Sequence, residues 1–242
     1  MNIVNRLTCR INENYQLGEI INRINEHPYN EEESDSEDED ILKSFIEISD
    51  INEGEGFNFI YGTYYYEYDA PAQLLIISQN GARIRESTIV KRNILDFWIT
   101  DDNRALFSKS DNPSKKGRTK LSEFLFNDFN IIEPVEFNIN QIEESIMQNG
   151  EFGGMWTTSF NDRIGAINSG IAYGEDIHED LVFEDIGNSP KSGTGITYNF
   201  MNEQVKVKIN KKGTIQIPGK EIMPENIEIF DLIREFDDYI ID

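Results

Sequence analysis

The last sixty residues of the chain constrain its fold most strongly. Two stretches in which apolar and polar residues alternate, 204–210 and 214–218, flank a short Lys-Lys-Gly turn. An amphipathic helix is predicted to follow, over about 224–242. A hairpin followed by an amphipathic helix predicts an antiparallel sheet with a helix laid on one face.

Alternation along this hairpin separates an inner side from an outer side. The inner side is predicted to carry Val205, Val207, Ile209, Ile215 and Ile217. The matching apolar stripe of the helix holds Ile229, Leu232, Ile233, Phe236, Tyr239 and Ile240. The outer side would then present Lys206, Lys208, Thr214 and Gln216, with Lys211 and Lys212 at the tip. Because a helix covers only one side of such a sheet, we expect the outer side to be a contact surface.

The earlier part of the chain reads as a meander of short strands with helices near its ends. Strands are predicted over 57–68, 73–78 and 82–86, with an Asn-Gly turn between the last two. A second hairpin is predicted from 93–100 and 104–108, and helices over 17–24, 120–128 and 141–148. Asn140 and Glu143 fit a capping box at the start of the last of these helices. We therefore expect an α+β protein of antiparallel sheets with helices packed on one face, in two similar-sized halves, 1–139 and 140–242.

The chain is strongly acidic, with a formal net charge of −23. Residues 31–40 hold eight acidic side chains and no base, so the rest of the chain still carries −15. We expect 29–40 to be a mobile surface loop, because like charges repel and cannot form a core. The overall charge disfavours nucleic acid as a partner and suits solubility or contact with a basic protein surface.

Cys9 is the only cysteine, so it cannot form a disulfide within the chain. No secretory signal pattern precedes it, and no apolar stretch approaches the roughly 18 residues of a spanning helix. These features predict a cytoplasmic protein that does not enter a membrane. They do not indicate its oligomeric state.

No motif in the sequence predicts a catalytic residue, a metal site or a cofactor. The segment 174–180 groups one histidine with carboxylates, but neighbouring residues on one loop do not converge easily on an ion. We therefore interpret the segment 174–180 as a solvated turn rather than a metal site. The glycines around 193–195 lack the spacing of a phosphate-binding loop, and Cys9 lies in a predicted strand.

Two basic groups stand out against the acidic background. One comprises Arg104, Lys109, Lys115, Lys116, Arg118 and Lys120, and the other Lys206, Lys208, Lys211, Lys212 and Lys220. Each group has enough cations to contact several phosphates. The alternative is that these side chains are solvated or paired with the protein's own carboxylates. The sequence leaves both open, and we predict Lys115, Lys116 and Arg118 as binding residues.

The stretch 205–219, followed by a long helix, resembles the strand–turn–strand–helix core of TATA-box-binding-protein-like domains. The resemblance covers about forty residues, and the first half of the chain shows no second copy. It implies a curved antiparallel sheet with helices on its convex face. It also implies nucleic-acid binding, in opposition to the charge of the chain.

Two functions follow from these observations. The leading hypothesis is a non-enzymatic binding protein that acts through protein–protein contacts. Its abundance of Ile, Asn, Lys and Glu is compatible with a role in phage–host conflict or antiviral defence. The alternative is a nucleic-acid-binding or RNA-cleaving protein, in which His178 with Glu175 or Glu179 would be the acid–base pair.

Overall fold

The computed structural model describes residues 3–34, 41–54, 56–78, 81–108, 114–148, 152–161, 167–187, 189–201, 203–218 and 228–241. The chain forms two compact units. Residues 11–132 make the N-terminal unit, and residues 1–10 with 133–242 make the C-terminal unit. The division therefore lies at 132/133 rather than 139/140, and the first ten residues belong with the C-terminal unit because β1 pairs with β14. The predicted α+β class with an antiparallel sheet is confirmed.

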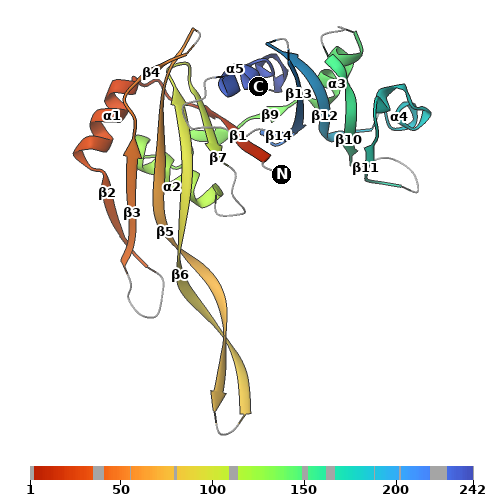
Figure 1. The fold of residues 1–242 in the computed structure, drawn as a ribbon. Helices are drawn as coiled ribbons and strands as arrows, with labels where there is room; N and C mark the ends of the chain where they lie inside the picture. The colour runs from red at the N-terminus through yellow and green to blue at the C-terminus, as the bar shows by residue number, and fades with distance from the viewer. Residues whose placement is uncertain are drawn as a thin grey trace. The chain divides into compact units, whose positions relative to one another are not determined.

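The N-terminal unit is built on an antiparallel sheet in the order β7-β6-β5-β3-β2, with β4 beside β5 (Figure 1). Its elements are α1 (Leu17–Glu26), β2 (Tyr29–Glu33), β3 (Ile41–Ile48), β4 (Asn52–Glu53), β5 (Asn58–Ser78), β6 (Gly81–Thr100), β7 (Arg104–Ser108) and α2 (Ser114–Phe126). One face of this sheet is buried, and on it the rings of Tyr64 and Tyr66 stack 5.1 Å apart. Gly117 of α2 packs directly against the Tyr66 ring: a Cβ atom at this position would lie only 2.7 Å from the ring, so a larger residue would not fit without a shift.

Strands β5 and β6 are longer than the sequence predicts. The stretches 57–68 and 73–78 join into one strand of 21 residues that includes Pro71. Proline is accommodated because β3 pairs with β5 as far as Tyr66, and no strand of the described residues pairs with that edge of β5 beyond this point. The partner strand β6 runs without a break from Gly81 to Thr100. The turn between β5 and β6 includes Gln79 and Asn80, which lie outside the described residues.

The prediction of a loop over 29–40 is wrong for its first part. Tyr29–Glu33 forms β2, which pairs with β3. Its residues alternate in exposure, and Glu32 forms an ion pair with Lys120 of α2. Pairing and a nearby cation thus offset the repulsion between its three glutamates. Residues 35–40 lie outside the described part of the chain.

The C-terminal unit contains an antiparallel sheet in the order β11-β10-β12-β13-β14-β1. Its strands are β1 (Ile3–Ile11), β8 (Ile132–Pro134), β9 (Glu136–Phe137), β10 (Phe152–Phe160), β11 (Gly170–Tyr173), β12 (Lys191–Phe200), β13 (Glu203–Asn210), β14 (Thr214–Pro218) and β15 (Ile240–Ile241). Its helices are α3 (Ile139–Gln148), η1 (Ile177–Glu179), α4 (Leu181–Ile186), α5 (Glu228–Arg234) and η2 (Asp237–Tyr239).

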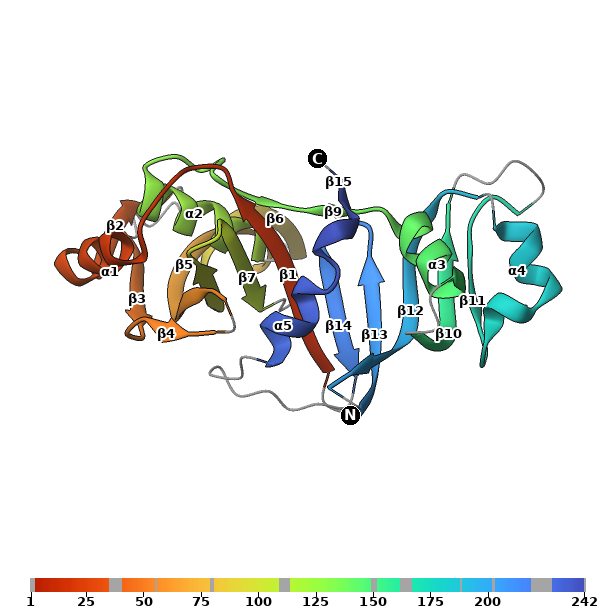
Figure 2. The same cartoon turned by 90° about the horizontal axis from the view of Figure 1, so that it is seen from above.

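The predicted closing hairpin is present as β13 and β14, with Gly213 in the left-handed conformation (φ 78°). Figure 2 shows α5 lying over β1 and β14. Just after the helix, Phe236 contacts Tyr198 of β12, with ring centroids 5.7 Å apart. The predicted helix over 224–242 is too long, because it ends at Arg234. Beyond it the chain makes a short 3₁₀ turn, and β15 then pairs with β9. Residues 224–227 lie outside the described part.

Two other helices differ from prediction at their starts. Helix α2 begins at Ser114, so part of the predicted basic loop is helical. At the start of α3, the backbone N–H of Gln141 donates to Asn138 Oδ1 at 3.2 Å. The side chain that caps the helix is therefore Asn138 rather than the predicted Asn140. Glu143 is buried and accepts a hydrogen bond from Thr158 instead of closing a capping box. None of the helices in the described residues is long and apolar enough to cross a membrane.

Candidate binding surface

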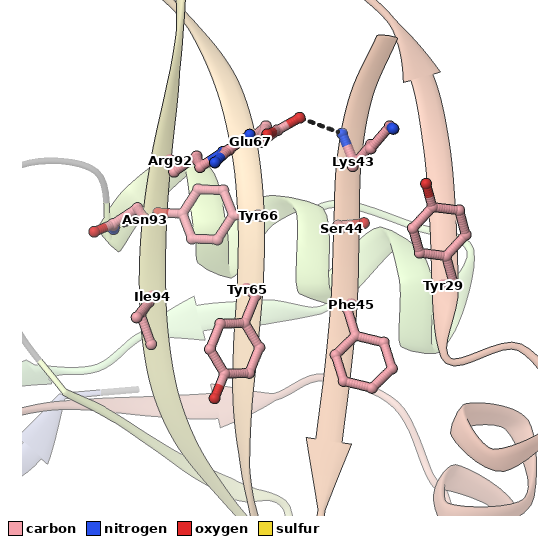
Figure 3. Close-up of a pocket in the computed structure, with 10 residues that line it drawn as sticks. All are labelled: Tyr29, Lys43, Ser44, Phe45, Tyr65, Tyr66, Glu67, Arg92, Asn93 and Ile94. Carbon is pink, nitrogen blue, oxygen red and sulfur yellow. Dashed lines mark hydrogen bonds and ion pairs between the residues drawn. The ribbon is translucent and has the colours of Figure 1, made fainter.

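The exposed face of the N-terminal sheet carries a row of large apolar side chains that crosses four strands. Tyr29 of β2 lies opposite Phe45 of β3. Tyr65 of β5 lies opposite Phe45 on one side and Ile94 of β6 on the other. Each of the four is between 38% and 54% exposed, and Figure 3 shows them side by side. Directly opposed residues share one side of a sheet, so these four form a continuous strip, which we call the apolar row.

A line of charged side chains of alternating sign borders the apolar row. Glu31 lies opposite Lys43, and the backbone N–H of Lys43 donates to Glu67 Oε2 at 3.0 Å (Figure 3). Arg92 Nε donates to the other oxygen, Glu67 Oε1, at 2.7 Å. The Glu67 carboxylate on β5 therefore ties β3 to β6. The Arg92 guanidinium, together with the Lys43 N–H, holds the pKa of Glu67 below its usual range.

The other border of the apolar row is acidic. Glu47 lies opposite Thr63, which lies opposite Asp96 and donates to it at 3.1 Å. The Tyr65 hydroxyl donates to Glu47 Oε2 at 3.1 Å, and this hydrogen bond raises the pKa of Tyr65. In the same way, the Tyr29 hydroxyl donates to Glu31 at 2.6 Å, which raises its pKa. These bonds tether the edges of the rings and leave their faces accessible.

A groove of about 290 Å³ runs beside the apolar row, on the side of Lys43, Glu67 and Arg92, and its lining is mostly apolar. Among its polar groups, Glu67 is paired with Arg92 and the Asn93 amide donates to the Tyr66 hydroxyl. A shallow apolar strip with charged borders suits contact with another polypeptide, because exposed apolar patches of this kind mark interaction sites.

The ion pair between Arg92 and Glu67 is expected to stabilise the folded state slightly, by an amount that depends on pH. A carboxyl group with a lowered pKa stabilises the folded state above its unfolded pKa, near 4.5, and that contribution disappears as pH falls through the folded pKa. We expect Arg92→Gln to lower the melting temperature slightly at pH 7, by the equivalent of about 0.2–1 kcal/mol, because Arg92 is exposed. The difference between variant and wild type should shrink as pH falls below about 4.5 and vanish once Glu67 is protonated in the folded state. A difference that stays constant between pH 7 and pH 2 would contradict this assignment.

The residues predicted on the outer side of the closing hairpin differ in accessibility. Lys206 is exposed, and its ammonium lies 5.9 Å from the centre of the Trp156 ring. Lys208 and Gln216 are half-buried and lie opposite each other. Thr214, in contrast, is only 2% exposed, so the expectation that it is accessible is wrong.

Thr214 is buried because other segments cover the turn before it. The backbone N–H of Thr8 donates to the Gly213 carbonyl at 2.8 Å, and that of Val135 donates to the Thr8 carbonyl at 3.1 Å. The lysines of the turn remain exposed, and Lys211 Nζ lies 3.8 Å from Glu136. Lys211 thus faces one of the protein's own carboxylates. A partner surface at Lys206, Lys208, Lys211 and Lys212 stays a prediction.

The structure divides the other predicted basic group. Arg118 is buried and donates to the Ile132 carbonyl, so it cannot offer its charge to a partner. Lys116 is exposed, donates to the Asp69 carbonyl at 2.7 Å and lies over the Tyr68 ring. Lys115 is exposed, whereas Lys120 pairs with Glu32. Lys109 and Lys220 lie outside the described residues.

The acidic segment around His178 includes the short helix η1 and ends just before α4 begins at Leu181. His178 is half-buried and Glu175 is exposed. Within the part of the chain that the structure describes, no three His, Cys, Asp or Glu side chains are grouped so as to hold a metal ion. Cys9 is fully buried in β1.

The sequence did not reveal the apolar row, although a signal was present. In β3, Ile41, Lys43, Phe45 and Glu47 alternate with Leu42 and Ile46, and the two sets are both partly apolar. A strand that is apolar on both sides indicates one buried face and one face available for contact. Only pairing with β2, β5 and β6 shows that Phe45 has apolar neighbours.

No protein-family model and no curated protein matches the chain. The likeness of the closing hairpin to TATA-box-binding-protein-like domains therefore rests on the sequence pattern alone.

Proposed function

We propose that this protein is a binding protein that acts through protein–protein contacts, with the apolar row as its principal contact surface. The observation that carries the proposal is the alignment of Tyr29, Phe45, Tyr65 and Ile94 across four strands on one exposed face. Full burial of such side chains contributes roughly 1.5–3 kcal/mol each. Because these four are already about half buried, covering them would add roughly half of that for each, a useful share of the energy of a specific contact.

The charges around the row favour a partner with a basic, apolar surface. Around the apolar row, the carboxylates of Glu31, Glu67, Glu47 and Asp96 outnumber the cations of Lys43 and Arg92, and the chain as a whole carries −23. Opposite charge on the partner would speed association and orient it. Phosphate backbones would be repelled, which is why a protein partner is preferred here over nucleic acid.

Replacing Phe45 by serine tests this proposal. We expect Phe45→Ser to reduce capture of the protein's partner by about tenfold or more, because it removes the centre of the apolar row. The fold should persist, since Phe45 is 39% exposed. The measurement is affinity capture from the native cell by tagged wild type and variant, quantified by mass spectrometry, with circular dichroism to confirm folding.

Leu42 and Phe45 lie on the same strand but on opposite faces, so a conservative Leu42→Val change in the buried face is a matched control. It should alter stability slightly and leave capture unchanged. If Phe45→Ser retains every partner of the wild type, the contact surface is not the apolar row and the proposal fails.

A further inference from the structure

Beyond the body of the N-terminal sheet, β5 and β6 continue as a two-stranded ribbon, which Figure 1 shows extending away from the rest of the unit. We call residues 70–78 and 81–92 the arm. β3 pairs with β5 no further than Tyr66, and β7 pairs with β6 no further than Phe97. In the described residues, the strands of the arm therefore pair only with each other. A lone two-stranded ribbon is marginally stable in water, which calls for a surface that covers it.

The end of the arm is apolar on one side. Leu75 lies opposite Ile84, and Ile77 lies opposite Ala82. Leu75, Ile77 and Ile84 are 63%, 76% and 67% exposed, respectively. Leu75 and Ile77 are separated from Tyr65 by even numbers of residues, so they lie on the side of β5 that carries the apolar row. We call Leu75, Ile77, Ala82 and Ile84 the tip patch.

The arm differs in charge from the rest of the chain. Between residues 70 and 92 there are four basic side chains and one acidic one, a net charge of +3. Because the whole chain carries −23, the remainder carries −26. Arg83 and Arg85 lie opposite Ile76 and Leu74, on the side of the ribbon away from the tip patch. Without Arg92, which pairs with Glu67 beside the groove, the arm still carries +2. The six charged side chains around the apolar row, Glu31, Lys43, Glu67, Arg92, Glu47 and Asp96, carry −2 together, so the arm has an apolar patch and a charge opposite in sign to that of the row's surroundings.

We propose that the occupant of the groove is the arm of a second copy of this chain, so that two molecules exchange arms reciprocally. This inference rests on the proposed function and names its partner. The arm cannot fill its own groove, since ten residues of continuous strand place Leu75 about 33 Å from Tyr65 along β5. Both surfaces belong to the same unit, so one two-fold axis can bury two arms and two grooves. Contact between two arms alone would bring like charges together.

Sedimentation velocity between about 1 and 100 µM tests the inference. We expect the wild type to dimerise and Ile77→Asp to be at least tenfold weaker in dimerisation, because the new carboxylate would lose its hydration on entering a groove with a mostly apolar lining. Ser87→Asp, which adds the same charge to the arm away from the tip patch, is the matched control and should dimerise nearly as well as the wild type. Equal weakening by both variants would overturn the inference.

Disulfide trapping identifies which surfaces meet. Ile77→Cys and Phe45→Cys, mixed in equal amounts and oxidised, should give a disulfide-linked heterodimer, whereas either alone should give little. Wild type is the background control, because Cys9 is fully buried. Efficient crosslinking of Ile77→Cys with itself would show arm-to-arm contact and overturn the inference.

Two other outcomes separate this inference from the proposed function. A wild-type monomer at 100 µM that still captures a different protein through Phe45 would overturn the second-copy inference and leave the proposed function intact. A monomer with no Phe45-dependent capture would overturn both. Flotation of monomeric wild type with phosphatidylserine vesicles, abolished by Ile77→Asp, would assign the tip patch to lipid and also overturn the inference.

Discussion

Replacing Glu143 with alanine is expected to destabilise the C-terminal unit by about 3–5 kcal/mol. Glu143 is 3% exposed and Lys191 is 6% exposed, with Lys191 Nζ 3.5 Å from Glu143 Oε2. Burial raises the pKa of Glu143 and lowers that of Lys191, so each charge depends on the other for its compensation. Without the carboxylate, the partners that remain to the Lys191 ammonium among the described residues are the Ile186 carbonyl at 3.0 Å and the face of Phe183. Chemical denaturation of the purified variant measures the loss.

Two variants control this prediction. Glu144→Ala removes an exposed carboxylate from the same helix and should change stability by less than about 0.5 kcal/mol. The double change Glu143→Leu with Lys191→Met removes both buried charges and should recover most of the loss, because desolvation offsets much of the attraction in a buried pair. If Glu143→Ala costs no more than Glu144→Ala, Lys191 does not depend on Glu143.

Truncating Phe236 to alanine is expected to cost about 3–5 kcal/mol in the same unit. The side chain is fully buried, and its ring contacts that of Tyr198, whose hydroxyl donates to Glu235 at 2.9 Å. Its removal would leave a cavity beside Leu232 and Ile233, both 3% exposed, and would loosen α5 from the sheet. Thermal unfolding followed by near-ultraviolet circular dichroism should show a lower midpoint for the C-terminal unit.

The double change Lys206→Glu with Lys208→Glu is the control for Phe236. These side chains lie on the other side of β13 from the buried Val205 and Val207, so reversal should cost about 0.5 kcal/mol. It also tests the partner surface predicted there, since charge reversal would weaken binding without unfolding. A stability loss as large as that of Phe236→Ala would mean that the outer side of β13 is covered.

Local patterns in the sequence predicted several elements well. The alternation of Val205, Val207 and Ile209 specified which side of β13 is buried, and the structure buries all three. The helical spacing of Leu17, Ile20, Ile21 and Ile24 likewise predicted α1, and all of these except the half-buried Ile21 lie in its buried stripe. In both cases neighbours along the chain decide the outcome, because strand and helix periodicities are properties of short segments.

Features that depend on distant partners were predicted less well. Glu143 fits a capping box locally, but Thr158 and Lys191 draw it into the core. Thr214 has the parity of an outward residue, yet segments around Thr8 and Val135 cover it. Burial at such positions depends on which segments pack together, and one-dimensional alternation does not contain that information.

The sequence by itself determined the α+β class, the acidity of the chain and the inner sides of its amphipathic elements. The tertiary structure decided the candidate site, because Tyr29 and Ile94 are separated by more than sixty residues along the chain. They belong to one strip only through the register of β2, β3, β5 and β6. A slip of one residue in any of these pairings would move a side chain to the opposite face, so register creates the apolar row.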